Sequence, residues 1–139
     1  MIILSVDYGR ARTGIAVCDK DEILASPVTV ITEYNMEKLA DKTAAAAKER
    51  AAELIVLGLP RNMDGSEGAS AENVRHFAGL LQERTNLEVV FQDERCTTVT
   101  AHEYLNMTDT RGKKRKAVVD SVAAVIILED YLRRRRNGK

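Results

Sequence analysis

Residues 2–18, IILSVDYGRARTGIAVC, decide the fold of this chain. Ile2–Val6 is a short apolar run rich in β-branched residues, which predicts a buried strand, and it ends at Asp7-Tyr8-Gly9. Gly14–Cys18 has the same character and predicts a second strand, followed by a polar turn at residues 19–22. Strands joined by such short connections pair antiparallel, and Asp7 falls at the end of the first one.

The neighbouring elements extend this pair into a sheet with helices. Ile23–Thr32 predicts a third antiparallel strand, in which Pro27 indicates an edge position. The apolar run Leu54–Leu59 is typical of a strand buried on both faces in a parallel arrangement, and Leu87–Phe91 predicts a fifth strand. Between these strands, apolar residues recur at helical spacing in two segments. Their predicted core-facing positions are Met36, Leu39, Ala40, Thr43, Ala47 and Ala51 in the first segment, and Val74, Phe77, Ala78 and Leu81 in the second.

The last part of the chain is predicted to be mainly helical. Thr97 or Thr98 is a suitable N-cap for a short helix that ends near Leu105. Met107–Arg115 is polar and basic, which predicts a loop, and a long helix is predicted from Lys116 to the neighbourhood of Arg135. We expect residues 133–139 to form a flexible basic tail.

Together these elements predict an α/β fold with a mixed five-stranded sheet and helices on its faces. An antiparallel meander of three strands comes first, and βαβ crossovers follow. Neither a repeat nor a linker divides the sequence, so we expect one domain over residues 1–139.

The zero net charge of the chain is a cancellation between two regions. Lys and Arg together number 21, as do Asp and Glu. Residues 1–110 hold 18 acidic and 11 basic residues, whereas residues 111–139 hold 10 basic and 3 acidic ones. A basic segment of this kind suits a polyanionic partner such as nucleic acid, although a solvated tail would have the same composition.

Other features of the composition exclude whole classes of protein. Cys18 and Cys96 are the only cysteines, which argues against a disulfide framework or a zinc knuckle and indicates reduced thiols. No basic region precedes the first apolar run and Asp7 interrupts it, so a signal peptide is not expected. The longest apolar run, Val122–Leu128, is far shorter than the roughly 18 residues of a membrane helix. We therefore expect a cytoplasmic protein with no membrane partner.

Asp120 is the least expected residue of the predicted final helix. At helical spacing it shares a face with apolar or aromatic residues, namely Ala123, Ala124, Ile127 and Tyr131. A carboxylate on such a face is costly unless it is paired, hydrogen-bonded or bound to a cation. Two structural explanations stand beside a functional one: an acid in the first turn of a helix, or an ion pair with Lys116 one turn earlier.

Further acidic residues follow two of the predicted strands. Asp7 ends the first strand, where ligands gather in α/β sheets, although an Asx turn would also explain it. Asp93 and Glu94 follow the fifth strand, where they would also compensate the dipole of the next helix. If the fourth and fifth strands run parallel to the first, all these carboxylates emerge at the same edge of the sheet.

Carboxylates gathered at one edge need a cation, because clustered negative charges repel one another. Oxygen ligands favour Mg²⁺ or Mn²⁺ over zinc and copper. Two such ions about 4 Å apart support phosphodiester hydrolysis, in which one helps to generate hydroxide and the other stabilises the leaving oxygen. No nucleophilic side chain is then needed, and we interpret His76 and His102, both on predicted helices, as surface or packing residues.

Two loops are candidates for contacting nucleic acid. Residues 58–65, GLPRNMDG, suit an anion-binding turn, and residues 111–116, RGKKRK, directly precede the helix of Asp120, where a phosphate must be drawn in. Arg133–Arg136 would add weak, non-specific contact at most. The candidate nucleic-acid contacts are Arg10, Arg12, Arg61, Asn62, Arg95, Lys113, Lys114, Arg115 and Lys116.

Four blocks of the sequence carry a family resemblance: VDYGRARTGIAV, GLPRNMDGSEG, DERCTT and KAVVDSVAAVIILEDYL. In this order and spacing, they resemble the signature blocks of the YqgF family, the RuvX-type Holliday junction resolvases. The resemblance covers residues 1–135 and implies a ribonuclease H-like fold and a metal-dependent nuclease. Members of the family are implicated in maturing the 5′ end of 16S ribosomal RNA.

The resemblance also implies a set of site residues. By position, Asp7 matches the aspartate of the family's first strand, Glu94 the acid of its D-E-R block, and Asp120 the aspartate of its final helix. These three would be the catalytic residues and the ligands of Mg²⁺ or Mn²⁺, and Asp93 could share or exchange the role of Glu94. The chain departs from the family pattern at Ala117, where a glycine often follows the lysine, and this predicts a less flexible preceding loop.

Three functions remain in competition after this comparison. The leading one is a nuclease acting on structured nucleic acid, with precursor 16S rRNA as substrate and branched DNA as the alternative. A non-catalytic nucleic-acid- or ribosome-binding module is the second, supported by the basic segment at 111–116. An ATPase of the actin-like or sugar-kinase type is the third, because such proteins also begin with a strand ending in D-x-G, but they need a second domain for which 139 residues leave no room. The sequence leaves open whether the protein is a monomer or a homodimer.

Overall fold

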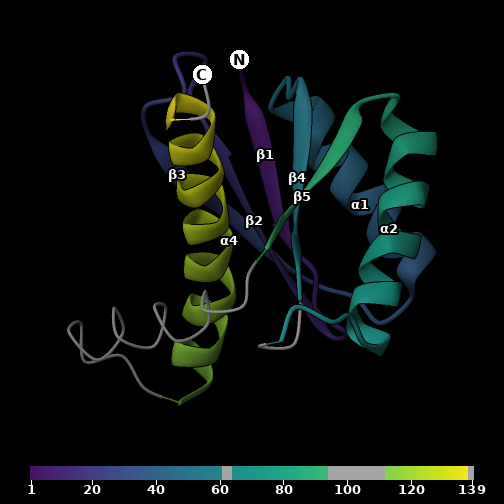
Figure 1. Ribbon diagram of the computed structural model, residues 1–139. Helices are drawn as coiled ribbons and strands as arrows, with labels where there is room; N and C mark the ends of the chain where they lie inside the picture. Colours follow the sequence, from purple (N-terminus) through teal and green to yellow (C-terminus); the bar gives the residue numbers. More distant parts are fainter. Residues whose placement is uncertain (61–63, 94–111, 138–139) are drawn as a thin grey trace.

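The computed structural model describes residues 1–60, 64–93 and 112–137, and it describes the side chains of these residues except those of 112–121. Within these ranges, a five-stranded sheet has α1 and α2 on one face and α4 on the other (Figure 1). The elements are β1 (Ile3–Asp7), β2 (Arg12–Cys18), β3 (Ala25–Thr32), α1 (Met36–Glu49), β4 (Leu54–Leu59), α2 (Ala69–Thr85), β5 (Glu88–Asp93) and α4 (Gly112–Asn137).

The order of the strands in the sheet is β3-β2-β1-β4-β5. The β1–β2 and β2–β3 pairs are antiparallel, whereas β1–β4 and β4–β5 are parallel. This confirms the predicted mixed sheet, in which a meander is followed by βαβ crossovers. The short helix predicted to end near Leu105 lies outside the described residues. None of the described helices combines the length and apolarity needed to cross a bilayer.

Strand alternation divides the apolar residues between two cores, one on each face of the sheet. On β1, Ile3 packs in the core beneath α4, whereas Leu4 and Val6 pack in the core beneath α1 and α2. The predicted core residues of α2 are all buried. His76 is exposed on the same helix, as a surface position requires. Each side chain of the sheet can therefore be assigned to a face from the parity of its position.

The first helix is shorter than its apolar periodicity predicts. It ends at Glu49, and Ala51 adopts a left-handed conformation with φ of 56° before the chain turns into β4. Ala51 is consequently exposed and does not belong to the helix face that packs on the sheet, which corrects the prediction for this residue. Pro27 lies on the edge strand β3 as predicted, opposite a register irregularity between Ile15 and Ala16.

Both ends of α4 differ from the prediction. The helix begins at Gly112, so residues 112–115, predicted as loop, are helical; lysine and arginine are good helix formers and no proline interrupts them. At the other end, residues 133–137 continue the helix and do not form a flexible tail. Tertiary contacts hold this last turn, because Arg134 donates to Gln92 at 2.8 Å and Arg135 pairs with Glu22.

Glu22 fastens three parts of the chain together at one end of the molecule. Its carboxylate accepts from the Met1 amine at 3.1 Å and from Arg135 Nε at 2.8 Å. The hydrogen bond from Arg135 is the main reason why the pKa of Glu22 lies below its ordinary value, against an opposing effect of burial. The start of the chain and the last turn of α4 lie side by side there (Figure 1).

We expect the substitution Glu22→Gln to lower the free energy of unfolding at neutral pH by about 1 kcal/mol, because a neutral amide accepts more weakly from two cations. The folded pKa is depressed, so the carboxylate's contribution is complete above the ordinary value of 4.5 and is lost as the pH falls through the folded value. Urea unfolding should therefore show a gap between wild type and variant that closes as the pH is lowered. Glu129→Gln, an exposed change on α4, is the control and should show no such gap.

Candidate active site

Asp7 occupies the carboxyl end of β1, a central strand of the sheet, and is half-buried. By parity it shares a face with Ile3 and Ser5, the face that α4 covers. The hydroxyl of Ser5 donates to the backbone carbonyl of Ala124 at 2.7 Å, which fixes the helix over the strand two residues before Asp7. The predicted position of Asp7 at the edge where the parallel strands end is confirmed.

The direction of α4 brings Asp120 to the level of Asp7. Met1 and Arg135 meet at Glu22, while Ser5 meets Ala124, so α4 runs antiparallel to β1. From Ser5 to Asp7 the strand advances about 6.6 Å, and from Ala124 back to Asp120 the helix advances about 6 Å. Position 120 therefore lies over the end of β1.

The face of α4 that carries position 120 is the one that packs on the sheet. Ala123, Ala124 and Ile127 are buried, and Tyr131 packs against the same core. Asp120 is the ninth residue of the helix, so it is not an acid of the first turn, and this excludes one of the two structural explanations for it. Its side chain lies outside the part of the chain whose side chains are described, as does that of Lys116.

Two glycines flank Asp7 on the neighbouring strands. Gly14 of β2 pairs directly with Asp7, and Gly58 of β4 follows Leu57, the partner of Val6. Both glycines are buried and belong to the face that α4 covers, because Ala16 and Val56, two residues away on their strands, pack in that core. Neither of these positions therefore places a side chain beside the carboxylate of Asp7.

These glycines are the part of the site that sequence reasoning missed. Each interrupts an otherwise apolar strand, GIAVC or LIVLGL. A glycine within a strand is often a sign that something approaches the backbone closely, and this signal was available in the sequence. It became interpretable only when the strand register placed both glycines next to the same aspartate.

Asp93 lies on the opposite face from Asp7. It ends β5 and pairs with Leu59, which packs in the core beneath α1 and α2. Phe91, two residues earlier on β5, packs against that same core. The structure therefore places Asp93 at the predicted edge of the sheet but separates its side chain from that of Asp7. Glu94 lies outside the described residues.

The turn after Asp7 is tightly built around Gly9. A Cβ atom at this position would lie 1.9 Å from the backbone oxygen of Arg12, which no side chain tolerates. The hydroxyl of Thr13 accepts from the Gly9 N–H at 3.2 Å and donates to the Gly9 carbonyl oxygen at 3.3 Å. The D-x-G element is thus a fixed turn that holds Tyr8, Arg10 and Arg12 at the edge of the sheet.

The candidate nucleic-acid contacts fall into three groups. Arg12 begins β2 on the face of Asp7, two residues from Gly14, whereas Arg10 is exposed and lines a cavity on the other face. Arg61, Asn62 and Arg95 lie outside the described residues. The basic run 113–116 forms the start of α4, and Ala117 continues the helix where a glycine would weaken it.

The described residues alone do not complete a metal site. Among them, no group of three or more His, Cys, Asp or Glu side chains is close enough to hold an ion. The expected ligand set of Asp7, Glu94 and Asp120 has one described side chain. That carboxylate, beside two glycines at the end of a central strand, has the oxygen donors that Mg²⁺ or Mn²⁺ prefers.

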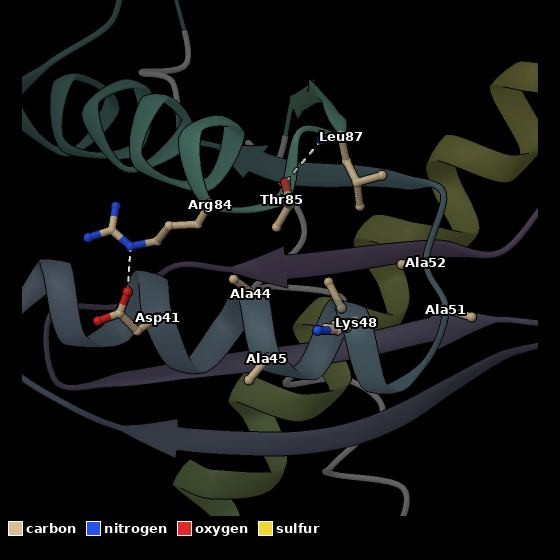
Figure 2. A pocket seen from close by; sticks show the side chains of 10 residues that line it. Asp41, Ala44, Ala45, Lys48, Ala51, Ala52, Arg84, Thr85 and Leu87 are labelled. Atoms are coloured by element: carbon tan, nitrogen blue, oxygen red, sulfur yellow. Dashed lines mark hydrogen bonds and ion pairs between the residues drawn. The ribbon is translucent and has the colours of Figure 1, made fainter.

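A cavity of about 500 Å³ between α1 and α2 lies away from this edge (Figure 2). Small side chains of α1 and the following turn line it, and Arg84 pairs with Asp41 at its mouth. Ala52 and Leu87, also in its lining, precede the starts of β4 and β5. The cavity is therefore at the amino ends of the parallel strands and does not belong to the candidate active site.

The sheet order β3-β2-β1-β4-β5, with helices on both faces, is that of the ribonuclease H-like fold. The solved structure of Thermus thermophilus RuvC superimposes on 99% of this chain and 97% of its own, with a TM-score of 0.62 and 12% sequence identity. At that identity the likeness concerns the fold alone, and it confirms the ribonuclease H-like architecture.

Sequence comparison identifies the family. Residues 1–134 match the family described as "RuvX: Holliday junction resolvase". A protein of Endomicrobium trichonymphae named "Putative pre-16S rRNA nuclease" is 43% identical over 94% of both chains. One of Clostridium botulinum with the same name is 40% identical over 96% of this chain and 98% of its own. This chain belongs to the RuvX family, a family of nucleases, which confirms the resemblance and gives no support to the ATPase alternative.

Proposed function

We propose that this protein is a metal-dependent nuclease that hydrolyses phosphodiester bonds of structured nucleic acid, with residues 1–139 as one nuclease domain. The observation that carries the proposal is the position of Asp7 at the end of a central strand. Glycines flank it on both sides, and position 120 of α4 lies level with it. A half-buried carboxylate at this edge of the sheet, where ligands of α/β proteins bind, suits a cation and a phosphate better than it suits packing.

The ligands of the metal in this proposal are Asp7, Glu94 and Asp120, and the ion is Mg²⁺ or Mn²⁺. When bound, such ions generate a nucleophile from water and stabilise the leaving oxygen. The parity of β5 favours Glu94 over Asp93, because Asp93 shares the face of Phe91 and Leu59. In this mechanism the protein positions three carboxylates around the scissile phosphate. No side chain acts as a nucleophile.

The start of α4 supplies the positive potential that the substrate needs. Lys113, Lys114, Arg115 and Lys116 fall within its first five residues, at the end where the helix dipole is also positive. Cations at this end oppose the dipole, so an anion bound there would stabilise the helix. Arg12, on the face of Asp7, adds a cation from the other side of the site. We infer that phosphates of the substrate occupy this region.

Precursor 16S rRNA is the substrate that we propose, because it is the substrate in the names of the two relatives. This function places the protein in the cytoplasm. The family description favours a second candidate, the four-way DNA junction. The two differ in stoichiometry, since trimming one RNA end needs a single active site, whereas resolving a junction needs two cuts and therefore a homodimer.

Removal of the metal tests the proposal. The purified protein should cleave a precursor RNA that spans the 5′ end of 16S rRNA in Mg²⁺ or Mn²⁺, and EDTA should abolish cleavage. Restoring the metal should restore it, because the chain offers no nucleophile of its own in this mechanism. Cleavage is measured on end-labelled RNA, with a four-way DNA junction assayed in parallel and the oligomeric state measured by light scattering.

Each outcome of this assay has a distinct meaning. Cleavage of the RNA by a monomer supports the first substrate, and paired cuts in the junction by a dimer support the second. Binding of both substrates without cleavage at any metal concentration would contradict the proposal and identify a binding module.

A further inference from the structure

A cavity of about 630 Å³ opens at the carboxyl edge of the sheet, on the face opposite Asp7. It is bounded by the turn after β1, the segment between β3 and α1, the end of β4 and the first turns of α2. Cavities of this volume are typical of small-ligand sites. Its lining includes Tyr8, Arg10, Tyr34, Ser70, Asn73 and Val74.

The walls of this cavity combine an aromatic, a cationic and a polar element. Tyr34 is 78% exposed, which is unusual for an aromatic side chain, and Arg10 is exposed as well. Ser70 and Asn73 contribute hydrogen-bonding groups from the first two turns of α2. None of the described lining residues is acidic. Such walls suit a ligand that has both a flat ring and an anionic group.

The floor of the cavity is built on buried side chains. The ring of Tyr8 packs on that of buried Phe77, with centroids 5.0 Å apart, and Val74 is buried beside it. Burial raises the pKa of Tyr8, and the nearby charge of Arg10 opposes this rise. The phenol therefore stays neutral at physiological pH, as a hydrogen-bonding group near a cation. A ligand would enter a preformed site between this floor and Tyr34.

The position of the cavity links it to the candidate active site. Asp7 and Tyr8 are consecutive, with α-carbons about 3.8 Å apart, and their side chains lie on opposite faces of the sheet. The chain turns at Gly9 immediately beyond them. A polynucleotide strand that crosses the edge of the sheet at this turn would therefore meet both faces.

We propose that this cavity binds one unpaired nucleotide of the substrate strand, adjacent to the phosphate that is cleaved at Asp7. Tyr34 stacks on the base, and Arg10 contacts the phosphate next to it. The inference rests on the proposed nuclease function and adds a requirement to it, namely a single-stranded nucleotide beside the scissile bond. Stacking on an aromatic side chain accepts any base, so this site selects for strandedness and not for sequence.

Binding of a short single-stranded RNA that contains 2-aminopurine tests this inference directly, in EDTA so that no cleavage occurs. The wild-type protein should quench the fluorescence of the base. Tyr34→Ala should remove the quenching and weaken binding about 5- to 20-fold, whereas Tyr34→Phe should retain both. Arg10→Gln should weaken binding about 5-fold and reduce its salt dependence. Ile23→Ala, an exposed apolar change at the other end of the molecule, and Arg50→Gln are the matched controls.

The outcomes separate this inference from the proposed function. If wild type cleaves RNA in metal while Tyr34→Ala binds, quenches and cleaves like Ile23→Ala, the cavity is not a substrate site and the nuclease proposal stands. If quenching follows Tyr34 but no substrate is cleaved, the cavity binds nucleic acid and the nuclease proposal fails. Equal affinity for a free mononucleotide and for the oligonucleotide would overturn the assignment to a strand.

Discussion

Replacing Asp7 with asparagine should lower the rate of cleavage by at least about 1000-fold, which corresponds to roughly 4 kcal/mol of transition-state stabilisation. The amide is isosteric but neutral, so it cannot balance the charge of a cation. The fold should tolerate the change, because Asp7 is only half-buried and neighbours two glycines. Single-turnover cleavage measures the effect, and circular dichroism with urea unfolding checks the fold.

A matched pair of substitutions on α4 provides the control. Asp120→Asn should cause a loss similar to that of Asp7→Asn, since position 120 lies level with Asp7. Asp130→Asn changes the same residue type on the same helix, where the carboxylate pairs only weakly with Arg133 at 3.3 Å, and should leave cleavage unchanged. Activity of Asp7→Asn within tenfold of wild type would remove this carboxylate from the chemistry.

The sheet could be predicted from the sequence because its strands are defined by local apolar runs. A buried strand is predicted by each of the apolar runs IILSV, GIAVC and LIVLGL, and the short turns between elements leave few ways to connect the strands. The placement of Asp7 followed from this topology alone. By contrast, the start of α4 could not be predicted from the sequence, because a run of lysine and arginine is compatible with both a solvated loop and a helix.

Features that depend on distant contacts lay beyond the sequence. The last turn of α4 resembles a solvated tail in the sequence because it contains four consecutive arginines. In the structure, contacts with Gln92 and Glu22, both distant in the sequence, hold it in place. The cavity beside Tyr34 is assembled from four separate segments. To assign the side chains of Asp7 and Asp93 to a face of the sheet, the pairing register of the strands must be known. No local sequence pattern predicts that register.

In the proposed site the register of β5 favours Glu94 over Asp93 as a ligand, and this predicts a sharp contrast between the two acids. Glu94→Gln should reduce cleavage about 1000-fold, whereas Asp93→Asn should stay within about tenfold of wild type. The reason is that Asp93 pairs with Leu59, which is 1% exposed in the core beneath α1 and α2, on the face away from Asp7. Both variants are assayed at saturating Mg²⁺ under single-turnover conditions.

A titration with Mg²⁺ makes the contrast independent of the catalytic rate. If Glu94 is a ligand, its loss raises the Mg²⁺ concentration needed for half-maximal cleavage, because one of three carboxylates no longer holds the ion. Asp93→Asn should leave that concentration unchanged, since its carboxylate does not face the site. The reverse pattern would be a metal dependence that is shifted by Asp93→Asn and not by Glu94→Gln. It would mean that Asp93, and not Glu94, faces the site at the end of β5. In that case the parity of the strand would not extend to its last residue.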